Sequence, residues 1–147
     1  LENGFVYDWF CGANLSKYLI DVAKKEGKTA VFLKPCDTYS FNQLVKEHRV
    51  KRENVYVIAI ECLGKLDIEK IKAVCGDGIC KIECGEKIAV STIYNDEATL
   101  FDAKDVLAER CINCKSKKHV AYDELLGEDG DVIDSGRFDE VAKLLER

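Results

Sequence analysis

The sequence predicts an α/β fold in which a small parallel sheet with strand-helix alternation occupies the first half, followed by a β-hairpin and C-terminal helices. Two short, almost unbroken apolar runs, residues 29–33 and 55–60, are typical of strands buried on both faces of a parallel sheet. Segments with apolar residues at helical spacing alternate with these runs. Parallel pairing with right-handed crossovers is therefore the simplest assembly.

Each helix of the first half has a recognisable start. One helix follows Asn14, carries its apolar residues on one face and ends by Gly27. Ser40 and Gln43 form a capping box, which predicts a second helix that starts just beyond Cys36. Asp67 opens a third helix.

The pattern changes after the third helix. Residues 79–84 and 87–93 alternate with period two about Gly85-Glu86, which predicts a β-hairpin. Residues 101–110 predict a helix with Val106 and Leu107 turned inward. We also expect an extra strand over residues 5–7, a loop over residues 127–136 and a last helix marked by Phe138, Val141, Ala142 and Leu145.

Composition bounds the class of protein. The chain has 147 residues and a formal charge of −5, which argues against a nucleic-acid or anionic-membrane partner. No apolar run approaches the roughly 18 residues of a membrane span, and the first residues lack a signal-peptide pattern, so we expect a cytoplasmic protein. We expect one domain over residues 1–147. The absence of methionine indicates either a removed initiator or, as we favour, a piece of a longer protein.

Cysteine is the unusual feature of the composition, because the chain has eight of them without secretory features. In a reducing compartment this indicates metal or redox chemistry rather than a disulfide framework, which remains the less favoured alternative. Cys36 and Cys62 follow the two predicted strands, at the sheet edge where α/β folds place ligands. A helix N-terminus there favours the thiolate, which is the metal-binding form.

Two further cysteines, Cys111 and Cys114, have the spacing with which one short loop holds a metal centre. Together with Cys36 and Cys62 they supply the four thiolates of a [4Fe–4S] cluster or of a structural zinc. Cys11, just ahead of the first helix, is a possible substitute ligand.

The remaining cysteines and the histidines have less specific patterns. Cys80 and Cys84 flank Ile82 on one strand face, which favours a place in the core. A second metal site formed by these two with Cys75 and Cys11 stays open. We expect His48 to be packed in the core and His119, beside a run of lysines, to be solvated. Phosphate-binding glycine loops and a hydrolase triad are absent from the sequence.

The order of four short motifs carries a family resemblance. These are Lys34-Pro35-Cys36-Asp37, Glu61-Cys62-Leu63-Gly64, the segment Leu107 to Cys114 and the segment Tyr122 to Glu128. The chain resembles the N-terminal region of the coenzyme-reducing hydrogenase and formate dehydrogenase beta-subunit family, which includes the deazaflavin-reducing (coenzyme F-420) hydrogenase beta subunit. Two departures are the loss of a proline near His119 and an end at Arg147, where relatives continue.

The resemblance implies an iron–sulfur redox protein. It implies a [4Fe–4S] cluster on Cys36, Cys62, Cys111 and Cys114, often a flavin (FAD or FMN), and a redox partner such as a hydrogenase, a dehydrogenase or a ferredoxin. We therefore expect an electron-transfer domain or subunit. The alternatives are a flavin-dependent oxidoreductase subunit, a zinc-stabilised interaction module without a redox role, and dithiol chemistry at Cys111 and Cys114.

Overall fold

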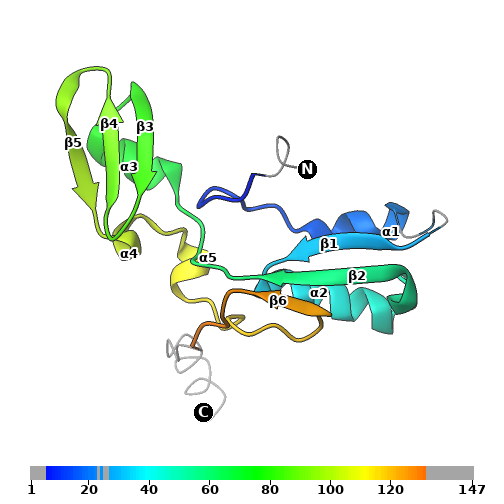
Figure 1. The fold of residues 1–147 in the computed structure, drawn as a ribbon. Coiled ribbons are helices and arrows are strands. Elements are labelled where there is room, and N and C mark those ends of the chain that lie inside the picture. The colour runs from blue at the N-terminus through cyan, green and yellow to red at the C-terminus, as the bar shows by residue number, and fades with distance from the viewer. Residues whose placement is uncertain (1–5, 23, 25–26, 132–147) are drawn as a thin grey trace, which may run out of the picture. The chain divides into compact units, whose positions relative to one another are not determined.

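A computed structural model describes residues 6–22, 24 and 27–131, and confirms the mixed α/β class. One three-stranded sheet is parallel and the other is antiparallel, as Figure 1 shows. The chain divides into two compact units where the sequence indicated one domain. Unit 1 comprises Leu1–Gly12 and Leu63–Ile112, and unit 2 comprises Ala13–Cys62 and Asn113–Arg147. Each unit is described by itself.

The sheet of unit 2 contains β1 (Thr29–Leu33), β2 (Val55–Ile60) and β6 (Glu124–Leu126), all parallel. The two predicted strands are confirmed with the predicted bounds. β6 was not predicted, because a three-residue strand is too short to show a period. It pairs with the last half of β2, where Ile60 lies opposite Leu126.

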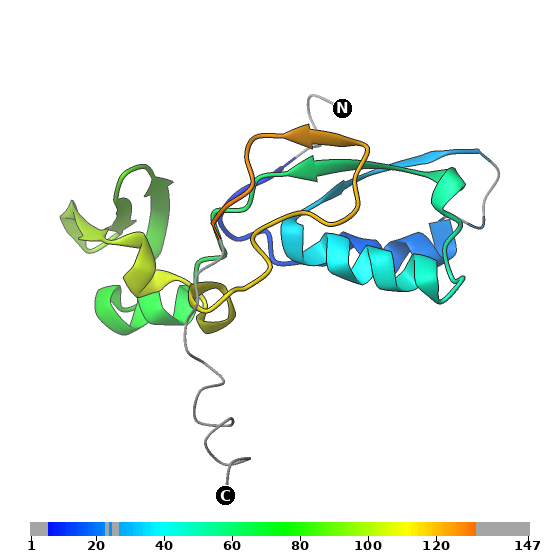
Figure 2. The same cartoon turned by 90° about the horizontal axis from the view of Figure 1, so that it is seen from below.

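Helices cover one face of this sheet, as Figure 2 shows for η1 (Leu15–Tyr18), α1 (Leu19–Val22) and α2 (Pro35–Lys46). A short turn of 3-10 helix, η2 (Arg52–Asn54), leads into β2. The strands alternate between buried and more exposed residues, so the expectation that they are buried on both faces is wrong for the described part of unit 2. The buried core consists of Leu19, Val31, Leu33, Phe41, Val50, Val55 and Val57.

The predicted capping box of the second helix is wrong, because α2 begins at Pro35. Proline is favoured at the first helical position, since its backbone is already bent and it has no N–H to satisfy. Ser40 therefore lies inside α2, where its hydroxyl accepts a hydrogen bond from the Asn14 amide. His48 is also not in the core: it is exposed just beyond the helix, with a positive φ of 57°.

Unit 1 is built around α3 (Ile68–Cys75) and a three-stranded antiparallel sheet of β3 (Ile79–Cys84), β4 (Ile88–Thr92) and β5 (Asn95–Phe101). The Asp67 side chain accepts a hydrogen bond from the Glu69 N–H and so caps α3, as predicted. The predicted hairpin is confirmed as β3 and β4. Leu66, Ile71, Ile88, Val90 and Val106 form the buried core.

The helix predicted over residues 101–110 is broken into α4 (Ala103–Val106) and α5 (Glu109–Ile112). Leu107 separates them because its backbone is extended and bridges that of Leu66. Residues 6 and 7 form no strand, so the extra strand expected there is wrong. The last predicted helix, with Phe138 and Val141, lies outside the described residues. None of the described helices has the length and apolar character of a membrane span.

Candidate metal centre

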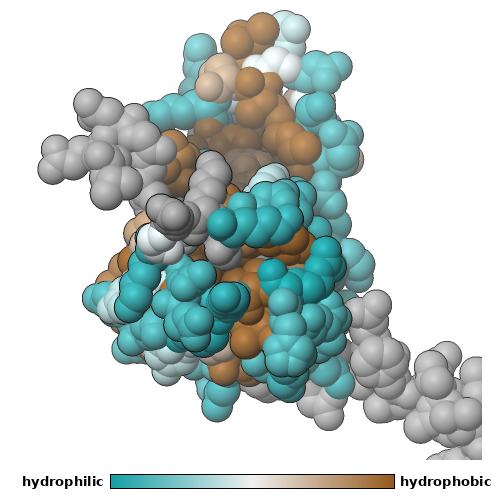
Figure 3. All heavy atoms as spheres, turned by 90° about the vertical axis from the view of Figure 1, so that its right-hand side faces the viewer, coloured by the Kyte–Doolittle hydropathy of each residue, from teal (hydrophilic) through white to brown (hydrophobic). Residues whose placement is uncertain are grey.

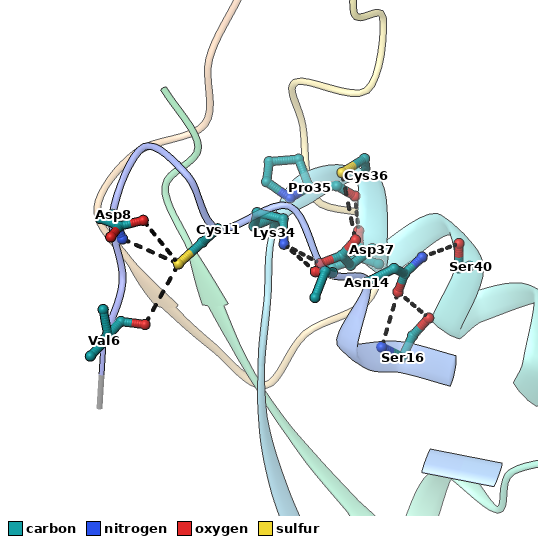
Figure 4. Close-up of polar contacts among 12 residues, drawn as sticks. Val6, Asp8, Cys11, Asn14, Ser16, Lys34, Pro35, Cys36, Asp37 and Ser40 are labelled. Carbon is teal, nitrogen blue, oxygen red and sulfur yellow. Dashed lines mark hydrogen bonds and ion pairs between the residues drawn. The ribbon is translucent and has the colours of Figure 1, made fainter. Parts of the chain in front are cut away.

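Cys36 is placed by the junction of β1 and α2. Lys34 is extended and precedes the helix, Pro35 starts it, and Cys36 is the second helical residue. The Cys36 thiol donates to Asp37 Oδ1 at 3.6 Å, as Figure 4 shows. The sequence predicts a helix that starts beyond Cys36, but Cys36 lies in the first turn of α2.

Lys34 and Asp37 fix this turn with an ion pair. Lys34 Nζ lies 2.9 Å from Asp37 Oδ2, and the two side chains are only 12% and 3% exposed. Lys34 Nζ also donates to the carbonyl of Ala13 at 2.7 Å. The contact with Oδ2 is an ion pair without hydrogen-bond geometry. A charge pair so poorly hydrated is costly to break, because one partner alone would leave an uncompensated buried charge.

The segment that follows Cys114 is tied to the same turn of α2. Thr38 is fully buried, and its hydroxyl donates to the Pro35 carbonyl and accepts a hydrogen bond from the Val120 N–H. Further along, Asp123 accepts a hydrogen bond from the Val57 N–H in β2. These contacts hold the loop that carries Cys114 against the sheet and helix that carry Cys62 and Cys36.

His119 lies in this segment and is buried, so the expectation of a solvated loop residue is wrong. Its ring Nδ1 and its backbone N–H both contact Asp129 Oδ1. Its Nε2 has no hydrogen-bond partner among the described residues. This pair could not be predicted from the sequence, because Asp129 lies ten residues further on in a stretch with the composition of a loop.

Three of the four predicted ligands interact electrostatically within unit 2. Burial by surrounding protein atoms, the Asp37 carboxylate and the sulfurs of Cys62 and Cys114 raise the pKa of Cys36 to about 12, and the Lys34 charge offsets part of this rise. Although Cys36 is exposed by its residue surface, neighbouring atoms remove enough water from the thiol to disfavour its charge. Cys62 and Cys114, which come from two other segments of unit 2, thus both affect the Cys36 thiol.

The raised pKa corrects one expectation. The sequence predicts a thiolate at the start of the helix, but a raised pKa keeps Cys36 a neutral thiol in the absence of metal. Desolvation and the negative charge of Asp37 outweigh the effect of a helix N-terminus.

Cys111 belongs to unit 1, in α5. Gly64, two residues beyond Cys62, packs closely in that unit: a Cβ added to Gly64 would lie 2.7 Å from Leu107 Cδ2 and 3.6 Å from Cys111 Cβ. Gly64 also has a φ of +106°. Only glycine meets both demands, which explains the glycine of the Cys62-Leu63-Gly64 motif.

The other cysteines are dispersed. The Cys11 sulfur accepts a hydrogen bond from the Asp8 N–H at 3.3 Å (Figure 4), and Cys75 is half-buried. Cys80 and Cys84 are exposed on β3, so their expected place in the core is wrong. A bulge next to Cys80 disturbs the alternation of inward and outward side chains along β3. The Cys80 thiol donates a hydrogen bond to the Ser91 carbonyl. All eight cysteines are free thiols.

Within the described part of the chain, no group of three or more His, Cys, Asp or Glu side chains is arranged to hold a metal ion. Neither a family model nor a curated protein matches this chain.

Proposed function

We propose that this chain is an iron–sulfur electron-transfer domain that holds a [4Fe–4S] cluster by Cys36, Cys62, Cys111 and Cys114. The observation that supports it is that the sulfurs of Cys62 and Cys114 help to raise the pKa of Cys36. The three cysteines come from a helix start, the end of a strand and a loop, which lie far apart along the chain.

The chemistry of the donors fits a cluster. Sulfur ligands are soft and prefer iron–sulfur clusters, zinc or cuprous copper to hard cations. Neighbouring thiols that disfavour one another's ionisation are stabilised as thiolates when a bound cation neutralises their charge. A [4Fe–4S] cluster needs four such ligands.

We assign Cys111 as the fourth ligand because it lies close to Cys114 along the chain. It lies three positions before Cys114, so the two Cα atoms stay within about 11 Å of each other in any backbone conformation. A Cys-x-x-Cys pair commonly provides two ligands to one centre.

A bound cluster supplies one-electron transfer, and the residues of the chain set its conditions. Cys36, Cys62, Cys111 and Cys114 hold it, and nearby charge adjusts its reduction potential. Lys34, Lys65 and Lys115 are the cations that we assign to this adjustment. The electrons would pass to or from a redox partner, such as a hydrogenase or dehydrogenase subunit or a ferredoxin, in the cytoplasm.

Anaerobic purification tests the proposal directly. We expect brown protein with broad absorption near 400 nm that bleaches with dithionite, and about four iron and four sulfide per chain, as this cluster type requires. Cys36→Ala, Cys62→Ala, Cys111→Ala and Cys114→Ala should each lose most of the iron. Cys80→Ala is the matched control and should keep it, because Cys80 is exposed on β3.

The alternatives give different results in the same experiment. Colourless protein with one zinc per chain would identify a zinc-stabilised module and exclude the cluster. Fluorescence released by denaturation would show that a flavin is bound as well. Iron loss in Cys80→Ala or Cys84→Ala would move the site to unit 1.

A further inference from the structure

The turn between β4 and β5 consists of two large apolar residues. Thr92 pairs with Asn95, so Ile93 and Tyr94 alone make the turn, and they are 68% and 73% exposed. Two-residue hairpin turns normally use small or polar residues such as Gly, Asn or Asp. Neither Ile93 nor Tyr94 has a positive φ, and a large apolar pair is unusual in so exposed a turn.

The side chains of Ile93 and Tyr94 pack against Gly78. The Ile93 N–H donates to the Gly78 carbonyl at 2.9 Å. A Cβ at Gly78 would lie 2.5 Å from Tyr94 Cε2 and 2.9 Å from Ile93 Cγ1, so both side chains rest on its bare backbone. Ile93 and Tyr94 are thus held in place although most of their surface faces solvent. We call this pair the turn knob.

Acidic residues border the turn knob without partners. Asp77 precedes Gly78, and Asp96 and Glu97 follow the turn. All three are exposed, and none forms an ion pair with another described residue. Residues 73–80 and 88–103 contain no Lys or Arg. Figure 3 shows that hydrophobic atoms reach the surface beside hydrophilic ones.

We propose that the turn knob docks into an apolar pocket of a partner protein, and that Lys or Arg side chains border this pocket. Exposed aromatic and apolar residues held in a fixed conformation are typical of the centre of a protein interface. Electrostatic complementarity places positive charge opposite these carboxylates in such an interface. A symmetric contact between two copies of this chain would instead place the same carboxylates against each other.

The proposal does not depend on the iron–sulfur function. It concerns a surface of unit 1 and would hold for a protein without a cluster. Cluster content and docking are measured separately, so the failure of one leaves the other intact.

The first test asks whether the turn knob serves the fold. In the full chain, the double variant Ile93→Ser with Tyr94→Asn replaces both apolar side chains by polar ones that tolerate the negative φ of this turn, and we expect a folding equilibrium constant within tenfold of that of the wild type. A tenfold or larger loss in the folding equilibrium constant would show a structural role and overturn the proposal.

The second test identifies the partner. Benzoylphenylalanine placed at position 94 of the full chain is photo-crosslinked in extract, and the crosslinked peptides are identified by mass spectrometry; the same probe at position 18, exposed in unit 2, is the control. We expect one protein, crosslinked at apolar residues flanked by Lys or Arg.

Charge reversal completes the test with that purified protein. Asp77→Lys, Asp96→Lys and Glu97→Lys together should weaken its binding at least tenfold, and added salt should weaken wild-type binding. Crosslinks to another copy of this chain, to acidic sites or to nothing beyond the control would overturn the proposal.

Discussion

Asp123 joins three parts of unit 2 through one carboxylate. Oδ2 accepts from the Val57 N–H and Oδ1 from Arg52 Nη2, both at 2.7 Å. The Arg52 and Val57 hydrogen bonds lower the pKa of Asp123, against an opposing effect of burial. A single residue just ahead of β6 therefore ties that strand to the strand beside it.

Replacement of Asp123 by Ala should destabilise the chain by about 1.5–3 kcal/mol, because hydrogen bonds to a charged group are lost and the Val57 N–H is left without its acceptor. Denaturant unfolding measures this loss. Glu124→Ala is the matched control, since its exposed carboxylate makes one long contact of 3.4 Å with the Tyr56 hydroxyl. Equal losses in the two variants would contradict the role of Asp123.

The same residue gives stability a dependence on pH. Because the folded pKa of Asp123 is lower than its ordinary value of 3.8, its contribution is complete above pH 3.8 and is lost as the pH falls below that value. Unfolding followed from pH 5 to pH 2.5 should therefore show a steeper loss in the wild type than in Asp123→Asn. Parallel curves would refute this assignment.

Single elements show which sequence signals are sufficient. The runs that became β1 and β2 were predicted with their bounds, because β-branched and apolar residues were uninterrupted and ended by clear turn residues. β5 was missed, since its turn is Ile93-Tyr94 and carries none of the usual turn residues. The prediction of one helix over residues 101–110 is wrong, because the backbone pairing of Leu107 with Leu66 outweighs local helix propensity.

Gly64 makes a prediction at the level of the connection between β2 and α3. Gly64→Ala should cost more than the 1–2 kcal/mol of a left-handed alanine, because the added methyl also meets Leu107. Gly76→Ala is the control: its φ of +72° is also positive, but nothing lies within 4 Å of an added Cβ. Thermal unfolding of the two variants separates backbone strain from the steric clash, and a similar loss in both would exclude the clash.

At the scale of the whole molecule, unit 1 is mainly an insertion between two neighbouring strands of unit 2. β2 and β6 pair side by side although residues 61–123 separate them. Closing so long a loop costs entropy. The three-residue strand β6 makes few contacts to offset this cost. Hydrogen exchange should therefore show amides of β6 exchanging about tenfold faster than those shared by β1 and β2. Equal protection would indicate one cooperative unit.

Part of the candidate site could be predicted because its sequence signals are local. Strand ends and a Cys-x-x-Cys spacing are local signals, so Cys36, Cys62 and Cys114 were chosen from the sequence alone, and in the structure the Cys62 and Cys114 sulfurs both affect the pKa of Cys36. Thr38 and Asp123 were not assigned a role, because Val120 and Val57, with which they form hydrogen bonds, lie far away along the chain. Burial of His119 likewise depends on Asp129.

The chain passes between the two units three times, at residues 12 and 13, 62 and 63, and 112 and 113. A protease that nicks one of these passages leaves the two units joined covalently by the other two. Limited digestion should consequently yield a clipped protein that migrates as one species under native conditions and separates into fragments only in denaturant.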